Sequence, residues 1–160
     1  MKALIAYDSQ FGNTEKVALA IGDAIGSQPD VQVLRVGSVT PEHLATTTLL
    51  IVGSPTQRFR PTTGTTDFLK SIPKDGLKGI KVASFDTRLT EGEIGKNRIL
   101  AFFVRLYGYA AEPISKELKK KGGELIQPPE GFYVEGMEGP LTEGELERAA
   151  EWARLVARNQ

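Results

Sequence analysis

The chain has no cysteine among its 160 residues. Disulfide bonds, thiolate metal sites and thiol nucleophiles are therefore excluded. An excess of one charge is also absent, because 20 Lys and Arg residues balance 20 Asp and Glu residues. Domains that bind nucleic acids usually carry a strong basic excess, so this balance predicts that nucleic acid is not a partner.

Long apolar runs are missing as well. The longest, from residue 99 to residue 111, is interrupted by Arg105 and is too short to span a bilayer. The first residues lack the basic segment and the apolar run of a signal peptide. We therefore expect no transmembrane segment and a cytoplasmic location. The length, with 40% hydrophobic and 25% charged residues, predicts a single globular domain over residues 1–160.

The sequence does contain an alternation of apolar runs and amphipathic segments. Nearly continuous apolar runs are typical of parallel strands that are buried on both faces. The last helix opens with Thr142 and Glu145 at the spacing of a capping box. The alternation predicts an α/β fold, a doubly wound sandwich with about five parallel strands. We expect strands at 3–7, 31–36, 49–53, 80–85 and 124–126, the last resuming at 132–134, and helices at 13–25, 65–71, between 97 and 121, and at 142–157.

The most informative motif lies at the turn from the first strand into the first helix, and it reads Ser9-Gln10-Phe11-Gly12-Asn13-Thr14. Backbone N–H groups at such a turn, together with the positive end of the helix dipole, can bind a phosphate. The motif has no Lys or Arg, so hydrogen bonds and the dipole would neutralise the anion. An ordinary helix cap, with Ser9 or Asn13 as the capping residue, is the alternative interpretation.

Two more polar loops follow the third and fourth strands. They read Gly53-Ser54-Pro55-Thr56-Gln57-Arg58-Phe59-Arg60-Pro61 and Phe85-Asp86-Thr87-Arg88-Leu89. In doubly wound sheets, ligands bind beyond the carboxyl ends of the strands. The three loops are therefore predicted to form one site at that edge of the sheet.

These loops resemble those of the flavodoxin family. The first motif is similar to the family's T/S-x-x-G-N-T loop, which holds the phosphate of FMN. Residues 53–56 resemble the loop along one side of the flavin ring, and residues 85–88 stand where the third flavin loop begins. Weaker similarities lie at 128–132 and 139–145. The resemblance covers nearly the whole chain. It implies the strand order 2-1-3-4-5, FMN as the cofactor, and one- or two-electron transfer between redox partner proteins.

The same resemblance implies no catalytic side chain and no metal ligand. The residues that it implies for FMN binding are Ser9, Gln10, Phe11, Gly12, Asn13, Thr14, Ser54, Pro55, Thr56, Gln57, Arg58, Phe59, Phe85, Asp86, Thr87 and Arg88.

The chain also departs from the family pattern. Flavodoxins that carry low-potential electrons are usually strongly acidic, whereas this chain has a formal net charge of zero. They often stack a Trp or Tyr on the flavin, but here the second loop offers only Phe59, between Arg58 and Arg60, and the third offers Arg88. We expect one or more of these guanidinium groups to lie beside or over the flavin ring. The alternative is that the arginines belong to solvated loops.

An insert separates the third loop from the next helix. Residues 89–108 run on where a short loop would suffice, and a loop of that length in a compact domain is usually functional or disordered. Its apolar content argues against disorder. We predict a helix over about 97–107 and the start of the next helix near 110–112, since Pro113 fits a first turn. The insert would be extra core, a lid on the flavin, or a docking surface for a partner or a second copy.

Two other functions stay open at this point. An FMN-dependent NAD(P)H:quinone-type oxidoreductase would need a substrate pocket over the flavin, which the insert could build. A module that binds no flavin and acts only in protein interactions is the other alternative. A phosphoacceptor receiver domain of the same fold is excluded, because Asp8 has no acidic neighbour and the third strand ends in Gly53 and Ser54.

Overall fold

The computed structural model describes the backbone of residues 1–160 and every side chain except that of Tyr107. The strands are β1 (Ala3–Tyr7), β2 (Val31–Arg35), β3 (Leu49–Pro55), β4 (Lys81–Leu89), β5 (Glu124–Leu125) and β6 (Glu130–Val134). The helices are α1 (Asn13–Ile25), α2 (Pro41–Ala45), α3 (Thr63–Ser71), α4 (Glu91–Gly95), α5 (Arg98–Tyr107), α6 (Ala111–Lys120) and α7 (Glu145–Arg158), with a short 3-10 helix η1 (Val36–Ser38).

The strands form one parallel sheet in the order β2-β1-β3-β4-β5, with β6 also paired to β4. β5 pairs with the start of β4, opposite Lys81 and Val82, whereas β6 pairs with its end, from Phe85 to Leu89. The two short strands therefore share the fifth position. The predicted fold, strand order and interrupted fifth strand are confirmed.

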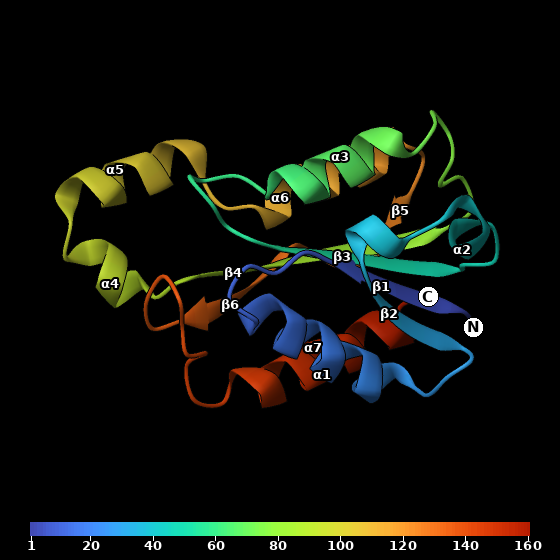
Figure 1. Ribbon diagram of the computed structural model, residues 1–160, viewed down its shortest axis with the longest axis horizontal. Coiled ribbons are helices and arrows are strands. Elements are labelled where there is room, and N and C mark those ends of the chain that lie inside the picture. The colour runs from blue at the N-terminus through green and yellow to red at the C-terminus, as the bar shows by residue number, and fades with distance from the viewer.

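Helices cover both faces of the sheet, with α1 and α7 on one side and α3 and α6 on the other (Figure 1). Every residue of β1 is buried, as expected for a central parallel strand. On the α1/α7 face, the core includes Phe85, Phe132 and Trp152. On the opposite face, Phe68 and Ile114 pack against the sheet. No helix in the described part of the chain is long and apolar enough to cross a bilayer.

The predicted capping box of the last helix is wrong. α7 begins at Glu145, and its N-cap is Gly144, whose φ of 85° lies in the left-handed region. The Glu145 carboxylate does not reach back to residue 142 but accepts the backbone N–H of Tyr133 at 2.7 Å and two guanidinium N–H groups of Arg148 at 2.7 and 2.9 Å. A strand amide and a cation thus compete successfully for the carboxylate, and Glu145 ties α7 to β6.

The hydrogen bonds of the Glu145 carboxylate stabilise the fold to an extent that depends on pH. Burial alone would raise the pKa of Glu145, but the Arg148 side chain and the Tyr133 amide outweigh it and lower the pKa. A lowered folded-state pKa stabilises the fold above the ordinary pKa, and the contribution is lost as pH falls through the folded-state value. We expect Glu145→Gln to cost about 1–2 kcal/mol at pH 7 and much less at pH 3. Urea unfolding at both values checks this, with the exposed Glu147→Gln as control. An equal cost at both pH values would contradict it.

Candidate functional site

A cleft of about 1540 Å³ opens at the carboxyl ends of β1, β3 and β4. It lies where the topology predicts a ligand site. The first loop contributes Gln10, Phe11 and Asn13 to its lining, and β4 contributes Thr87 and Arg88. The remaining lining residues include Thr56, Gln57, Arg58, Phe59, Arg60, Ile94, Leu100, Phe103, Val104, Tyr109, Val134 and Met137. The three predicted loops therefore do meet around one cavity.

The first loop is built to receive an anion. Gly12 has φ 91°, and the space around its Cα is open. The Ser9 hydroxyl accepts the N–H groups of Gly12 at 3.1 Å and Glu15 at 3.4 Å, which holds the loop in place. Among the described residues, no acceptor bonds to the four other backbone N–H groups of the loop and first helical turn, those of Gln10, Phe11, Asn13 and Thr14. Four unused donors at a helix N-terminus fit the phosphate of FMN.

Two side chains of the first loop are anchored to neighbouring segments. Asn13 donates from Nδ2 to the Glu138 carbonyl at 3.0 Å, and a Cβ at Gly139 would overlap the Asn13 carboxamide. The Thr14 hydroxyl is buried and lies 2.8 Å from that of Thr87. The first loop is thus fixed both to the segment after β6 and to the third loop.

The second loop contains an unusual tight turn. Gln57 and Arg60 exchange two backbone hydrogen bonds, at 2.8 and 2.9 Å, around Arg58 and Phe59. Both central residues have positive φ, 48° at Arg58 and 68° at Phe59. This is the conformation that hairpin turns normally give to Asn-Gly. The turn also touches the first loop, because the Gln57 amide donates to that of Gln10.

The base of the second loop is held by two hydroxyl groups. Ser54 is fully buried, and its hydroxyl accepts the Thr62 N–H at 3.0 Å and donates to the Pro55 carbonyl at 3.0 Å. The Thr56 hydroxyl accepts the N–H of Ala110, at the end of the insert, at 3.1 Å. These two side chains shape the loop from beneath, and only Thr56 also lines the cleft.

Phe85 was predicted to contribute to the FMN site, but the structure places its side chain in the core. Its side chain is fully buried beneath the sheet, with ring centroids 6.0 Å from Phe132 and 6.3 Å from Trp152. Alternation along β4 turns residue 85 toward the α1/α7 core, so its side chain is not in the cleft. Gly53 makes room for the ring, because a Cβ there would overlap it.

The third loop holds a buried ion pair beneath the cleft. The Asp86 carboxylate is fully buried and accepts N–H groups of Arg88 at 2.7 and 2.8 Å and of Ala111 at 2.9 Å. The Arg88 guanidinium lies 3.7 Å from the ring centroid of Tyr109, and a Cβ at Gly131 would overlap it. Arg88 lines the cleft, but its charge is already compensated by Asp86.

Burial and the contact between Asp86 and Arg88 together set the pKa values of these residues. Desolvation raises the pKa of Asp86, although the Arg88 guanidinium and the Ala111 amide both oppose the rise. Desolvation also raises the pKa of Tyr109, and the Arg88 charge opposes it. For Arg88, burial would lower the pKa, but hydrogen bonding to Asp86 outweighs it and raises the pKa. Arg88 is therefore held as a cation in contact with Asp86 and Tyr109.

The insert forms two helices that project beyond the carboxyl edge of the sheet (Figure 1). α5 starts and ends within a residue of the predicted helix, and α6 starts at Ala111 as expected, whereas the short α4 was not predicted. Leu100 and Val104 line the cleft, and the Phe103 ring lies 5.9 Å from that of Phe59. No described side chain of α5 is buried, so this helix is not extra core.

Removing α5 should therefore leave the domain folded. We expect replacement of residues 99–107 by a short Gly/Ser loop to change the melting temperature by only a few degrees, because both core faces remain. Solvent access to bound flavin, self-association, or both should change. Thermal melts and flavin quenching by iodide measure this. Leu118→Ala, a fully buried side chain on α6, is the destabilising comparison at about 2–5 kcal/mol. An unfolded product would show that the insert is structural.

Sequence reasoning missed several lining residues. Tyr109 stands directly after the insert, between α5 and α6, and its position could have been a signal. Val134 and Met137 line the cleft from the segment after β6. Their only signal was the weak similarity at 128–132 and 139–145. In the described part of the chain, no group of three or more His, Cys, Asp or Glu side chains could hold a metal ion.

Comparisons with known proteins agree with this geometry. The family model described as flavodoxin matches residues 5–152. No curated protein matches the sequence significantly. A flavodoxin from the domain Archaea superposes with a TM-score of 0.73 at 23% identity, covering 99% of this chain and 97% of that one. Flavodoxin 2 from Bacillus cereus gives 0.76 at 22% identity and covers 100% of both chains.

A larger protein contains a similar part. Rubredoxin oxygen:oxidoreductase from Desulfovibrio gigas superposes with a TM-score of 0.70 at 20% identity. The match covers 98% of this chain but only 35% of that protein. At these identities, the structural likenesses show the fold alone.

Proposed function

Because this chain belongs to the flavodoxin family and is an FMN-binding electron carrier, we propose which of its residues hold the cofactor. The unused N–H groups of residues 10, 11, 13 and 14 would bind the phosphate, and they are the observation that carries the proposal. The second loop, from Ser54 to Phe59, would flank one side of the flavin. Thr87, Arg88 and Tyr109 would line the other side. When bound, FMN supplies the capacity to accept and release one or two electrons.

The protein's own contribution is binding, orientation and electrostatics. The Ser9 hydroxyl fixes the phosphate loop, and Asn13 anchors it to the segment after β6. Asp86 holds the Arg88 guanidinium in place at the floor of the cleft. Leu100, Phe103 and Val104 of α5 line the cleft, and they would shield part of a bound flavin from water.

Absorbance and binding measurements test this assignment. The purified protein, or apoprotein given FMN, should show flavin absorption bands and bind FMN much more tightly than riboflavin. Equal affinity for FMN and riboflavin would contradict the proposed phosphate site. A protein that binds neither would be the flavin-free interaction module that the sequence left open.

Direct substrate reduction is a second candidate function. The cleft of about 1540 Å³ exceeds the roughly 300–1,000 Å³ of ordinary small-ligand pockets, which leaves room beside a cofactor. NADH- or NADPH-driven quinone reduction by the FMN-loaded protein alone would identify an oxidoreductase of the quinone type. Its absence, with rapid electron exchange between the protein and small redox proteins, would identify a carrier.

Arg58 should tune the reduction potential. It is exposed and makes no ion pair among the described residues, in contrast to Arg88. Its cation would stand beside the negative charge that accompanies full reduction. We expect Arg58→Gln to lower the second one-electron potential by tens of millivolts, since about 59 mV corresponds to 1.4 kcal/mol. Spectroelectrochemistry checks this, with Arg154→Gln on α7 as control. Added salt should shrink the shift. An unchanged potential would mean that Arg58 faces a partner or solvent only.

Several finer points from the sequence are not tested by the structure. A cytoplasmic location and the absence of a nucleic-acid partner stay predictions, and a homodimer through residues 97–107 stays an open alternative. Cell fractionation tests the first, and binding to heparin or DNA at low salt tests the second. Sedimentation velocity tests the third.

A further inference from the structure

Exposed apolar side chains gather on α5. Ile99 is 70% exposed, Phe102 59% and Leu106 60%, and Phe103 adds 37%. Phe102 and Phe103 are adjacent, and each lies three or four residues from both Ile99 and Leu106, so the four side chains form one stripe along the helix. Exposed apolar patches with a polar rim mark interaction sites.

The segment that carries the stripe and the turn beside it are both basic. Residues 56–61 and 96–107 contain no Asp or Glu but five basic residues, in a chain whose formal net charge is zero. All five are exposed. Lys96 pairs with Glu93 at 3.0 Å, whereas in the described chain the four arginines make no ion pair. The four unpaired cations are Arg58, Arg60, Arg98 and Arg105.

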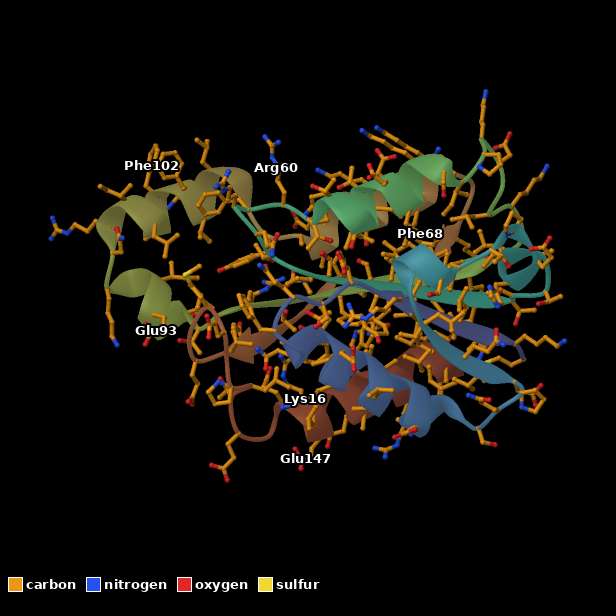
Figure 2. The ribbon with its side chains drawn as sticks, in the orientation of Figure 1. Lys16, Arg60, Phe68, Glu93, Phe102 and Glu147 are labelled. Atoms are coloured by element: carbon orange, nitrogen blue, oxygen red, sulfur yellow. The ribbon has the colours of Figure 1, made fainter. Side chains whose placement is uncertain are left out.

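The turn at residues 57–60 adds a second, independent observation. Arg58 and Phe59 both have positive φ, which costs a residue other than glycine about 1 kcal/mol or more. The strained turn places arginines beside α5, where the rings of Phe59 and Phe103 meet. In Figure 2, Arg60 and Phe102 point outward on the same side of the molecule. Strain of this kind is typical of functional segments.

We propose that α5 and the turn at 57–60 form a docking surface for an acidic redox partner protein. The proposal rests on the carrier function given above. Guanidinium groups bind carboxylates through paired hydrogen bonds, and aromatic side chains and Arg are the residues enriched in protein interfaces. Arg58 and Phe103 belong both to this surface and to the lining of the cleft. A partner docked here lies next to the cofactor site.

The charge of this surface also favours one kind of binding partner over the others. A second copy docking through the same surface would bring its own four unpaired arginines against these, and like charges in an interface are costly. The surface carries four Arg and one Lys, whereas the whole chain has nine Arg and eleven Lys. A membrane surface gains from either cation, so this bias toward Arg favours carboxylate groups held by a folded partner.

Electron transfer with two probes of opposite charge tests the proposal. The FMN-loaded protein receives one electron from reduced plant-type ferredoxin, an acidic probe, or, once reduced, gives one electron to oxidised cytochrome c, a basic probe. We expect the rate constant with ferredoxin to fall at least tenfold with rising salt and with R98E/R105E. Phe102→Ser should lower it severalfold. With cytochrome c, R98E/R105E should raise the rate constant.

Matched control variants carry the same changes on α7. Arg154→Glu and Leu155→Ser alter an exposed arginine and an exposed leucine on α7, which covers one face of the sheet, whereas α5 projects beyond its carboxyl edge (Figure 1). They should leave both rate constants unchanged within twofold. If they slow ferredoxin as much as the α5 variants do, or if ferredoxin is insensitive to salt, the proposal is wrong.

Binding measurements separate this proposal from the proposed function. Calorimetric titration of apoprotein with ferredoxin reports docking even if FMN binding fails, and should show at least tenfold weaker binding for R98E/R105E. Two results would overturn the proposal, because each would show that a different partner binds this surface. One is sedimentation with phosphatidylserine vesicles that Phe102→Ser abolishes, without binding of ferredoxin. The other is a homodimer that Phe102→Ser dissociates.

Discussion

Replacing Arg88 by glutamine should destabilise the fold by about 3–5 kcal/mol, because it leaves the fully buried Asp86 carboxylate without its cation. For a chain of this size, that is a fall in melting temperature of roughly 6–20 °C. Thermal melts and urea unfolding measure the effect. Arg154→Gln, at an exposed arginine with no ion pair in the described chain, should change stability by less than about 0.5 kcal/mol.

The pH dependence identifies the cause. Burial raises the pKa of Asp86, and Arg88 opposes the rise, so the variant should have a still higher folded-state pKa. A raised folded-state pKa gives stability that is fully present below the ordinary value and lost as pH rises through the folded-state value. R88Q should therefore lose more stability at neutral pH than at pH 4. Adding Asp86→Asn to R88Q should recover stability at neutral pH. If the double variant is as unstable as R88Q, packing rather than charge explains the loss.

The sequence predicted the sheet well because its strands carry a strong local signal. β1 and β3 are buried on both faces, so their residues had to be apolar almost without interruption. β4 was harder, because its last four residues, 86 to 89, are mostly polar although they still pair with β6. Asp86 and Thr87 are polar but buried, at the end of the strand next to the site. Their polarity is typical of a loop, so the sequence predicted a loop there.

Other features depend on contacts between distant residues, which the sequence does not reveal. The Glu145 carboxylate was assigned to a capping box, but Tyr133 and Arg148 hold it instead. Arg88 was one of the arginines of which at least one was expected to lie beside or over the flavin ring, and Asp86, two residues before it, compensates its charge. Along a strand, residues i and i+2 share a face, so this pair could have been anticipated once β4 was known to extend to Leu89.

The phosphate loop should show the largest functional effect, through Gly12→Val. Gly12 has φ 91°, where a β-branched residue is strained by about 1–3 kcal/mol, and the loop's unused N–H groups would lose their arrangement. Lost hydrogen bonds to a charged phosphate cost about 1.5–3 kcal/mol more. We expect FMN affinity to fall by roughly two orders of magnitude or more, since 1.4 kcal/mol is tenfold. Riboflavin affinity should change little. Fluorescence titration of apoprotein with both flavins measures this.

Gly79→Val is the matched control, because it introduces similar backbone strain at a glycine far from the proposed phosphate site. Gly79 has φ 83° and equally open surroundings, but it lies just before β4, at the opposite edge of the sheet from the cleft. Gly79→Val should therefore destabilise the fold by a similar amount and leave the affinities for FMN and riboflavin unchanged. Thr14→Ala removes the buried hydroxyl that joins the phosphate loop to Thr87 of the third loop, so it should loosen the loop and weaken FMN binding about tenfold. If Gly12→Val weakens FMN and riboflavin equally, or no more than Gly79→Val does, the loop does not bind the phosphate.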